Sequence, residues 1–541
     1  MLVSRLGWIF LCCLVIVTCC TGTINDPKPK KKLKILGVFG HLGKSHFDVF
    51  KPLLEELARR GHDLTVVSYF PRTEKAIATE PLPNYKDINL KTKDVDVFVN
   101  VVDLQRIRDT YFRVFIELYF LNSMASVACE AGLNHPDVKD LVKSGEQFDV
   151  VLTESFNTHC FFAVFHRVDA PFIEISTHQL MSWTVDELGI SNEASYIPTL
   201  FSHVPRPMNF FQRTWNVVAM MIEWTVANTL FKWNAQSVAE KTHGPGMFDL
   251  KEKSRNVTLM FVNTHYTLHG AQPFPPNVIE VGGLHIPRKT NPLPQDIAKF
   301  LDDAHEGVLY FNLGSVVKMS TVPEDKLTIL LNMFASIPRK VIWKWETDDL
   351  PHKPSNLLVK KWLPQFDIMN HPNVKCYFGH GGLLGLSEGV HTGIPMILMP
   401  LFGDQYQNAM AARARGVAIV LKYSELNERD LRHAVDEIFN NTRYRENARR
   451  LSKAYRDRPA TPLETAVWWT EYIGRGNGVP YVRTAGANMS WCTRNLVDVY
   501  TFLFTVLLTI IYVLYRLAKY LLLVRKKSKD IDQRASTKKR D

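Results

Sequence analysis

A strand–helix–strand pattern occurs twice in this chain, and it constrains the fold more than any other feature of the sequence. In the first copy, the apolar segment 33–39 has the character of a buried strand. Apolar residues then recur at helical spacing over 47–57, and segment 64–68 has the character of the next strand. Strands joined through a helix form parallel sheets, so this copy predicts a doubly wound α/β domain.

The second copy predicts another sheet of the same class. Its strands and helices are expected, in chain order, at 308–313, 323–336, 341–345, 357–360, 374–378, 383–391 and 396–399. The proline-rich polar segment 287–294 lies between the copies and has the composition of an interdomain linker. We therefore expect one domain over 23–286 and a second over 295–475, with the helical residues after 420 packing back across the cleft.

Apolar segments at both ends predict membrane targeting. Arg5 precedes the apolar run 6–20, and small residues follow it, which predicts a secretory signal peptide over 1–22. The alternative is an N-terminal anchor, for which this run is short. Segment 499–515 has no charge, which predicts a transmembrane helix over 499–520 after a lumenal stalk at 476–498.

Further signals favour a type I protein of the endoplasmic reticulum membrane. The strongly basic segment 521–541 is typical of a cytosolic tail, and Lys538-Lys539 near its end resembles a dilysine retrieval signal. A solvated basic tail is the simpler alternative. Three N-x-[ST] sites, at Asn256, Asn440 and Asn488, fall in the part that would then be lumenal.

The cysteines do not predict a metal centre. Four cysteines remain after the predicted signal peptide, and their spacing does not match that of metal ligands. One disulfide is possible in an oxidising lumen, with its pairing left open. These cysteines are Cys129, Cys160, Cys376 and Cys492.

The basic balance of the chain does not indicate a nucleic-acid partner. The formal net charge is +11, but residues 516–541 hold ten Lys and Arg against three acidic residues, and residues 23–34 hold five Lys against Asp26. Nearly all of the excess therefore lies at the two ends. A basic groove in the folded part has no support.

Two nucleotide-binding motifs are absent after the first predicted strand. Gly43-Lys44-Ser45 resembles the end of a phosphate-binding loop, but that motif requires Gly where the chain has Val38. The dinucleotide fingerprint G-x-G-x-x-G is missing from the same position. These departures argue against an NTPase and against an NAD or FAD enzyme.

A phosphate site is predicted where the strand 374–378 ends. His380, Gly381 and Gly382 follow this strand and precede a helix, so unpaired N–H groups and the positive end of a helix dipole lie at the sheet edge. Small residues let the backbone approach a phosphate there. A glycine-rich turn often binds no ligand. The residues that follow the neighbouring strands decide whether this turn is a phosphate site.

Those neighbouring strands end in groups that suit a nucleotide sugar. Asp404 and Gln405 follow strand 396–399 and suit sugar hydroxyls, although Asp-Gln before a helix is often an N-cap. Trp362 and Gln365 follow strand 357–360 and offer an aromatic face and an amide to a nucleobase.

Taken together, these motifs resemble the signature of the animal UDP-glycosyltransferases of glycosyltransferase family 1. The resemblance extends to nearly the whole chain, and it is strongest to the invertebrate UDP-glucosyltransferase-like members. It rests on Trp362-Leu-Pro-Gln365, His371-Pro372, His380-Gly-Gly, Glu388, Gly393-Ile-Pro395 and Phe402-Gly-Asp404-Gln405.

The resemblance implies a GT-B fold, an α/β architecture of two Rossmann-like doubly wound domains facing a cleft, here with a C-terminal single-pass transmembrane helix. It also implies an inverting enzyme that moves a sugar from a UDP-sugar to small lipophilic acceptors, without a metal or cofactor. The residues it assigns to the donor are Trp362 and Gln365 at the uridine, Glu388 at the ribose, Ser315, His380, Gly381 and Gly382 at the diphosphate, and Asp404 and Gln405 at the sugar.

The resemblance further implies a catalytic pair in the first domain. The family's general base is a His just after the first strand, which corresponds to His46, and His41 is its nearby competitor. An imidazole suits this task near neutral pH. The family orients that base with an Asp, and this chain has Glu154 in its place, so the charge is kept on a side chain one methylene longer.

Two departures from the vertebrate glucuronosyl members favour glucose over glucuronic acid as the transferred sugar. Leu384 stands where those members usually have Asn, and Lys344 where they have Arg. The alternative function is a membrane-anchored protein of the same fold that binds UDP-sugar or another small ligand without turnover, and Glu154 is its one hint. Neither a monomer nor a homo-oligomer is favoured by the sequence.

The aromatic pairs of the first domain are expected to be core. They could instead line an acceptor pocket. The pairs are Tyr111-Phe112, Phe161-Phe162 and Phe210-Phe211.

Overall fold

The structure is a computed structural model that describes residues 31–537, apart from 94, 108–111, 245, 246, 248, 348, 477 and 478. The predicted signal peptide at 1–22 and the predicted retrieval signal Lys538-Lys539 lie outside the described residues. So does Tyr111.

The first sheet has seven parallel strands. In spatial order they are β3 (Tyr85–Asn89), β2 (Asp63–Ser68), β1 (Lys34–Phe39), β5 (Val150–Glu154), β6 (Phe172–Ser176), β7 (Leu259–Val262) and β8 (Val278–Glu280). The helices of this half are α2 (Lys44–Arg59), α3 (Glu74–Thr79), η1 (Leu104–Arg106), α4 (Arg113–Asn134), α5 (Pro136–Ser144), η2 (His159–Phe165), α6 (Ser182–Glu187), α7 (Phe210–Val226), η3 (Ala227–Phe231), α8 (Lys232–His243), α9 (Leu250–Ser254) and α10 (Tyr266–His269).

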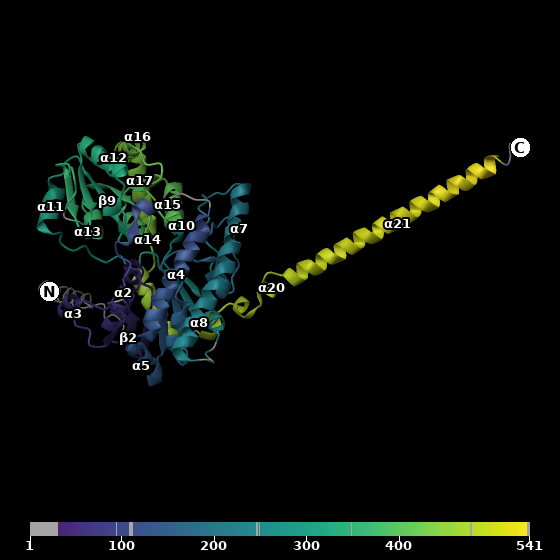
Figure 1. Cartoon of the computed structure of the whole chain (residues 1–541), viewed down its shortest axis with the longest axis horizontal. Coiled ribbons are helices and arrows are strands. Elements are labelled where there is room, and N and C mark those ends of the chain that lie inside the picture. Colours follow the sequence, from purple (N-terminus) through teal and green to yellow (C-terminus); the bar gives the residue numbers. More distant parts are fainter. Residues whose placement is uncertain are drawn as a thin grey trace, which may run out of the picture.

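The second sheet has six parallel strands. In spatial order they are β12 (Leu357–Lys360), β11 (Lys340–Lys344), β9 (Val308–Asn312), β13 (Val374–Gly379), β14 (Met396–Leu398) and β15 (Ala418–Val420). Its helices are α11 (Gln295–Asp302), η4 (Met319–Thr321), α12 (Glu324–Ser336), α13 (Gln365–Met369), α14 (Leu383–Thr392), α15 (Gln405–Ala414), α16 (Glu428–Asn440) and α17 (Thr442–Arg456). Figure 1 shows the two halves, with β2 in one and β9 in the other.

Alternate residues of the central strand β1 serve two cores, which explains why the strand is apolar throughout. Ile35 and Phe39 pack with α2 on one face of the sheet, and Leu36 and Val38 pack with η2, α4, α5 and α8 on the other. All four side chains are at most 2% exposed. Such burial contributes about 1.5–3 kcal/mol for each large apolar side chain, and it holds β1 inside the sheet, between β2 and β5.

Two segments link the halves of the molecule. The strand β4 (Val102–Asp103) from the first half pairs in parallel with β10 (Val317–Lys318) from the second. After the second sheet, α18 (Pro462–Gly474) returns to pack on α2 and β5, and it starts with a capping box made by Thr461 and Glu464. The two sheets are therefore held together by chain that crosses between them more than once.

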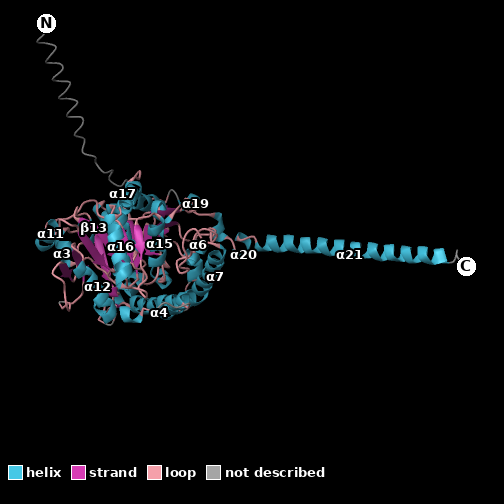
Figure 2. Cartoon of the chain, turned by 90° about the horizontal axis from the view of Figure 1, so that it is seen from above, coloured by secondary structure: helices cyan, strands magenta, loops and turns pink. Residues whose placement is uncertain are grey.

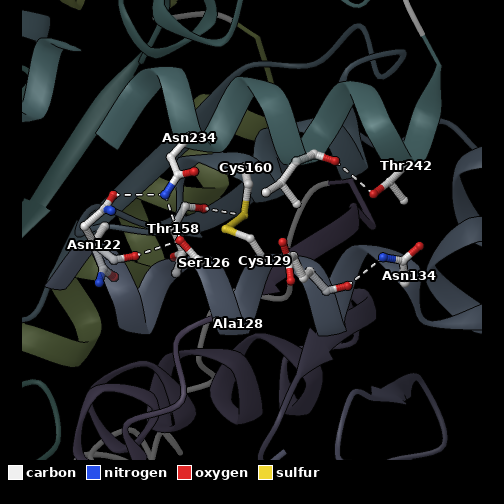
Figure 3. The surroundings of a disulfide bond; sticks show 12 residues. Asn122, Ser126, Ala128, Cys129, Asn134, Thr158, Cys160, Asn234 and Thr242 are labelled. Atoms are coloured by element: carbon white, nitrogen blue, oxygen red, sulfur yellow. Dashed lines mark hydrogen bonds between the residues drawn. A yellow bond between two sulfur atoms is a disulfide. The ribbon is translucent and has the colours of Figure 1, made fainter. Parts of the chain in front are cut away.

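A disulfide ties α4 to the first sheet. Cys129 of α4 is bonded to Cys160 of η2, beside a polar cluster that includes Asn234 of α8 (Figure 3). Of the other described cysteines, Cys376 is buried and Cys492 is exposed. The structure thus supplies the pairing that the sequence left open.

The C-terminal part ends in one long helix. Three short segments, α19 (Val479–Val482), η5 (Ala485–Asn488) and α20 (Trp491–Arg494), lead into α21 (Val497–Thr537), which projects from the rest of the chain (Figures 1 and 2). Two described helices, α4 and α21, are long and apolar enough to cross a membrane, and α21 has the higher mean hydropathy, 2.1 against 1.2. The helix predicted at 499–520 lies within α21.

The expectation that the aromatic pairs are core is right for one pair and wrong for the others. Phe161 and Phe162 are 1% exposed, whereas Phe112, Phe210 and Phe211 are 66–79% exposed. The buried pair lies in η2 against the sheet, while the exposed residues lie at the starts of α4 and α7, on the outer surface.

Candidate active site

The predicted base and its carboxylate meet at the carboxyl edge of the first sheet. The helix α2 begins at Lys44 directly after β1, so His46 lies in its first turn, and Glu154 is the last residue of the neighbouring strand β5. His46 Nδ1 lies 2.5 Å from Glu154 Oε1. The Glu154 side chain is 2% exposed and that of His46 21%, so the carboxylate is buried while the imidazole stays accessible.

This contact defines the protonation of the imidazole. An ionised carboxylate can only accept a hydrogen bond, so His46 Nδ1 carries the proton and Nε2 keeps a lone pair. The hydroxyl of Thr177, which follows β6, lies 3.2 Å from the same Nδ1. The predicted general base is thus held in one tautomer by a buried carboxylate. The extra methylene of glutamate does not prevent the contact.

Two further histidines surround His46, and the sequence analysis singled out only one of them. The His41 ring stacks on His46 at 4.1 Å between centroids, and His178 approaches it at 6.4 Å. Burial, with smaller effects of His46 and His178, holds the pKa of His41 well below its usual range. Burial also lowers the pKa of His178 to about 4. Both rings are therefore neutral near pH 7.

Phe156 is the residue around which the three histidines gather. Its ring centroid lies 4.9 Å from that of His46, and 5.1 and 5.0 Å from those of His41 and His178. No motif pointed to Phe156 or His178, because both follow strands of the first sheet without a recognisable spacing to His46. The apolar ring beside the base suits an apolar acceptor.

The same cluster contains potential metal ligands. Among the described residues, His41, His46 and Glu154 offer ligand atoms within 4.8 Å of one another. However, Nδ1 of His41 accepts a hydrogen bond from Gly43 N–H at 2.9 Å, and Nδ1 of His46 is bound to Glu154. The geometry is therefore explained by hydrogen bonding, and a metal-free site stays a prediction.

The predicted phosphate loop lies at the carboxyl edge of the second sheet. β13 ends at Gly379, and α14 starts at Leu383, with its first N–H groups facing the edge. Gly381 has φ +84°, and a Cβ there would lie 2.9 Å from the carbonyl oxygen of Gln405. Both facts require glycine at this position. Gly382 has an ordinary φ of −60°, but a Cβ there would lie 2.5 Å from the ring of His380, so this ring would have to move.

His380 is a neutral side chain in this loop. Burial, with a smaller effect of Lys344, lowers the pKa of His380 to about 4. Its ring also lies against Gly314, where a Cβ would approach within 2.7 Å. Ser315, the next residue, follows β9, and its carbonyl oxygen accepts a hydrogen bond from Asn100 N–H at 2.8 Å. His380 and Ser315 therefore lie at adjacent strand ends.

Gln365 and Glu388 form a half-buried pair beside this loop. Gln365 Nε2 donates to Glu388 Oε2 at 2.6 Å, while its carbonyl oxygen accepts from Tyr310 and from Asn312. Burial raises the pKa of Glu388 to about 7, against the lowering effect of Gln365. Both polar atoms of Gln365 are thus engaged, so in this structure it positions Glu388.

Trp362 lies at the rim, opposite the first sheet. Its side chain is among the exposed ones, at 63%, and the ammonium of Lys44 lies 5.7 Å from the centroid of the indole. Lys44 is also paired with Asp48 at 2.6 Å. Because Lys44 starts α2 and Trp362 follows β12, this cation–π contact joins the edges of the two sheets.

Asp404 and Gln405 lie at the end of β14, facing the base. Asn408 donates to Asp404 at 2.7 Å, and burial raises the pKa of Asp404 to about 6, against the lowering effects of Asn408 and His46. The contact between Lys44 and Trp362 shows that the two edges face each other. Gln405 Oε1 accepts from Leu401 N–H at 2.8 Å, which leaves its Nε2 donor for a ligand.

The start of α4 also reaches this loop, and no sequence signal pointed to it. Arg113 donates to the carbonyl oxygen of Leu401 and, at 2.7 Å, to the hydroxyl of Tyr406. Glu117 accepts from Gly403 N–H at 3.3 Å and pairs with Arg113 at 3.0 Å. The first half of the molecule therefore holds the loop that carries Asp404.

Comparison with known proteins shows which family the chain belongs to. Residues 38–530 match the family model described as "UDP-glucoronosyl and UDP-glucosyl transferase". The UDP-glycosyltransferase UGT5 of Dactylopius coccus is 36% identical over 89% of this chain and 90% of its own. The UDP-glucosyltransferase 2 of the same organism is 34% identical over 90% of this chain and 93% of its own.

A solved structure shows the same fold. It is the complex of a UDP-glucosyltransferase from Polygonum tinctorium, described as capable of glucosylating indoxyl, with 3,4-dichloroaniline. It is 16% identical, covers 82% of this chain and 99% of its own, and has a TM-score of 0.54. At this identity the likeness concerns the fold alone. The predicted GT-B architecture is confirmed by it and by the two parallel sheets.

Proposed function

The chain belongs to the family of UDP-glucuronosyl and UDP-glucosyl transferases, and from this premise we propose that it moves glucose from UDP-glucose to a hydroxyl group of a small lipophilic acceptor, with inversion at the anomeric carbon. The observation that carries the proposal is the 2.5 Å contact between His46 and Glu154 at the edge of the first sheet, while Asp404 follows β14 of the second sheet.

In the proposed reaction, His46 Nε2 takes the proton of the acceptor hydroxyl as its oxygen attacks the anomeric carbon. The bond from that carbon to the diphosphate oxygen breaks, and UDP leaves with the electron pair. Attack from the face opposite UDP inverts the configuration. General-base help of this kind contributes roughly 10²- to 10⁴-fold to the rate. Glu154 stabilises the imidazolium that forms, because its buried charge lies at Nδ1.

The second sheet supports the departure of UDP. Negative charge develops on the diphosphate, and the first N–H groups of α14, with the positive end of its dipole, face the edge where we place it. Gly381 and Gly382 let the diphosphate approach this backbone, and His380 and Ser315 flank it. Trp362 would stack on the uracil, with Gln365 and Glu388 at the uridine. Asp404 and Gln405 would bind the hydroxyls of the sugar.

The environment of Lys344 supports glucose rather than glucuronic acid. Its ammonium lies 3.1 Å from Glu346 Oε1 and 3.1 Å from Asn100 Oδ1, and its side chain is buried. The charge of Lys344 is thus already compensated, so it offers little to the carboxylate of glucuronic acid. The relative named UDP-glucosyltransferase 2 points the same way.

We place the enzyme in the endoplasmic reticulum membrane as a single-pass type I protein that needs no metal. The long apolar α21 supports an anchor. Asn256, Asn440 and Asn488 are exposed, and like the active-site residues they precede α21 in the chain, so they would lie on the same side of the membrane. The Cys129–Cys160 disulfide suits an oxidising lumen. A glycosidase that trims N-glycans should lower the apparent mass of the membrane-bound protein only after the membrane is permeabilised.

The alternative function, ligand binding without turnover, rested on the replacement of Asp by Glu154. Since Glu154 reaches His46, that reason falls away. The test is UDP release by detergent-solubilised protein given UDP-glucose or UDP-glucuronic acid with a panel of phenols and lipophilic alcohols. We expect acceptor-dependent release from UDP-glucose and a β-glucoside product by NMR. Binding of UDP-glucose without release would favour the alternative, and release from UDP-glucuronic acid alone would refute the choice of sugar.

A further inference from the structure

The helix α15 carries a buried amide, Asn408, that contacts two parts of the candidate donor site at once. Its Nδ2 donates to Asp404 Oδ2 at 2.7 Å and to the carbonyl oxygen of Gly381 at 3.0 Å. Asp404 lies one helical turn before Asn408, whereas Gly381 belongs to the turn between β13 and α14. One side chain therefore ties the residue predicted at the sugar to the turn predicted at the diphosphate.

These contacts fix the orientation of the amide. The carbonyl oxygen of Gly381 can only accept a hydrogen bond, so the amide nitrogen faces it and Oδ1 points to the other side. His269 Nε2 lies 3.3 Å from this Oδ1. Burial lowers the pKa of His269 to about 4, so the ring is neutral near pH 7 and its single proton is on Nε2. His269 therefore donates to Asn408, and Asn408 donates to Asp404.

The histidine comes from the first half of the chain. His269 is the last residue of α10, before the linker 287–294, and it is 4% exposed. Figure 1 shows α10 next to α15. Arg206 donates to the carbonyl oxygen of His269, and Arg415, which follows α15, donates to that of Leu268 at 3.2 Å. The backbone of α10 is thus held where the His269 ring meets Asn408.

The charge of Asp404 depends on Asn408 as well. Burial raises the pKa of Asp404 to about 6, and the hydrogen bond from Asn408 is the largest effect in the opposite direction. Two other titratable groups act on Asp404: His46, which also favours its ionised form, and Glu117 of α4, which is paired with Arg113. An ionised carboxylate accepts hydrogen bonds from hydroxyl groups more strongly than a protonated one. Asn408 therefore supports the form of Asp404 that suits a sugar.

We propose that His269 and Asn408 are positioning residues for the transferred sugar, in which His269 orients Asn408 and Asn408 orients the carboxylate of Asp404 toward the hydroxyl groups of the hexose. The inference rests on the proposed function, because it takes Asp404 as a residue that binds the sugar of UDP-glucose. UDP has no hexose. Loss of either positioning residue should therefore weaken the binding of UDP-glucose more than that of UDP.

A buried asparagine can also serve the fold alone, and the second half offers a matched example. The Nδ2 of Asn356 donates to three carbonyl oxygens between α12 and β11, those of Phe334, Ile337 and Arg339, and to no residue of the candidate site. Asn356→Leu removes an amide of the same kind from the same half of the molecule. It therefore measures what the loss of such an amide does to stability alone.

The test measures the Kd of UDP and of UDP-glucose by calorimetry, with detergent-solubilised full-length protein and without acceptor, from about pH 5 to about pH 8. The readout is the Kd of UDP-glucose divided by that of UDP, since this ratio isolates the contribution of the sugar. In the wild type, the ratio should fall as the pH rises through about 6, where Asp404 ionises. Asn408→Leu should raise the ratio severalfold at pH 7 and move this midpoint upward by roughly one pH unit.

The variants of His269 test the same line of contacts without touching Gly381 or Asp404. His269→Leu removes the donor to Asn408, so it should raise the ratio in the same direction, by less than Asn408→Leu. His269→Gln keeps an N–H group that can reach Asn408 Oδ1, so it should restore most of the wild-type ratio. Asn356→Leu should lower the Tm and leave both the ratio and its midpoint unchanged.

The contradicting results are distinct. The same ratio and midpoint in Asn408→Leu as in Asn356→Leu would refute the inference and leave the proposed function intact, provided that the wild type still transfers glucose. Equal weakening of UDP and UDP-glucose by Asn408→Leu would assign Asn408 to the diphosphate turn through Gly381, which overturns its role at the sugar. If Asn408→Leu does not fold, equal ratios for His269→Leu and His269→Gln would refute the inference. A wild type that binds neither ligand would refute the proposed function, and the inference with it.

Discussion

The strongest single prediction concerns the charge of Glu154. Glu154→Gln keeps the shape of the side chain and an oxygen that can accept from His46 Nδ1, but it removes the negative charge 2.5 Å from that nitrogen. The charge matters when His46 becomes an imidazolium in the transition state. A hydrogen bond to a charged group contributes about 1.5–3 kcal/mol. The variant should therefore lose about 10- to 150-fold in kcat.

The assay is the initial rate of glucoside formation at saturating UDP-glucose and acceptor, together with the Kd of UDP from calorimetry. The Kd should not change, because the donor binds at the opposite sheet edge. Glu154→Asp is the matched control: it keeps the charge and restores the family's residue, so it should retain more activity than Glu154→Gln. A kcat within twofold of the wild type for Glu154→Gln would refute the reasoning, and equal losses in kcat and UDP affinity would indicate a damaged fold.

Four further predictions concern the donor site and the scaffold. Glu388, whose pKa burial raises to about 7, accepts more strongly from ribose hydroxyls when it is ionised, so UDP affinity should rise by up to about tenfold per pH unit as the pH approaches 7 from below, and level off above it; Glu388→Gln should flatten this dependence of the Kd. Gly381→Ala, at φ +84° with a contact at 2.9 Å, should weaken UDP binding at least about tenfold, whereas Gly145→Ala, at φ +65° in open space, should not. Arg113→Leu should raise the KM of UDP-glucose more than the Kd of UDP, because the loop it holds faces the sugar; equal changes would argue against that role. Cys129→Ser with Cys160→Ser should remove about 2–4 kcal/mol of stability and lower the Tm, while Cys492→Ser leaves the Tm unchanged.

Local patterns were sufficient to predict the elements that carry the site. Each strand predicted from apolar runs is present, with both ends within one residue of the prediction, because buried parallel strands are apolar on both faces. The donor residues could be grouped for a related reason. The carboxyl ends of parallel strands meet at one edge of a sheet, so His380 after β13 and Asp404 after β14 had to be neighbours.

Contacts between distant segments could not be predicted in the same way. Arg113 lies at the start of a largely apolar helix, and its partner Leu401 lies 288 residues away. The disulfide between Cys129 and Cys160 and the hydrogen bond from Arg494 to the carbonyl oxygen of Asp186 also join separate segments of the chain. Such contacts depend on how the two sheets are arranged, which no spacing within one segment encodes.

The exposed aromatic residues are the clearest error of the sequence analysis. Phe210 and Phe211 were assigned to the core because aromatic residues are usually buried, yet they are 66% and 79% exposed. Both residues lie in the first turn of α7, so which of its sides faces the core depends on how α7 packs on the rest of the first half, and no local pattern gives that.

The central claim is that His46 is the general base of an inverting transfer, and one comparison tests it most directly. His46→Ala is measured against the wild type for glucoside formation from UDP-glucose and for UDP binding. We predict a loss of roughly 10²- to 10⁴-fold in transfer with an unchanged Kd for UDP, because base and donor lie at opposite edges of the cleft. Retained transfer, with or without weaker UDP binding, would contradict the claim.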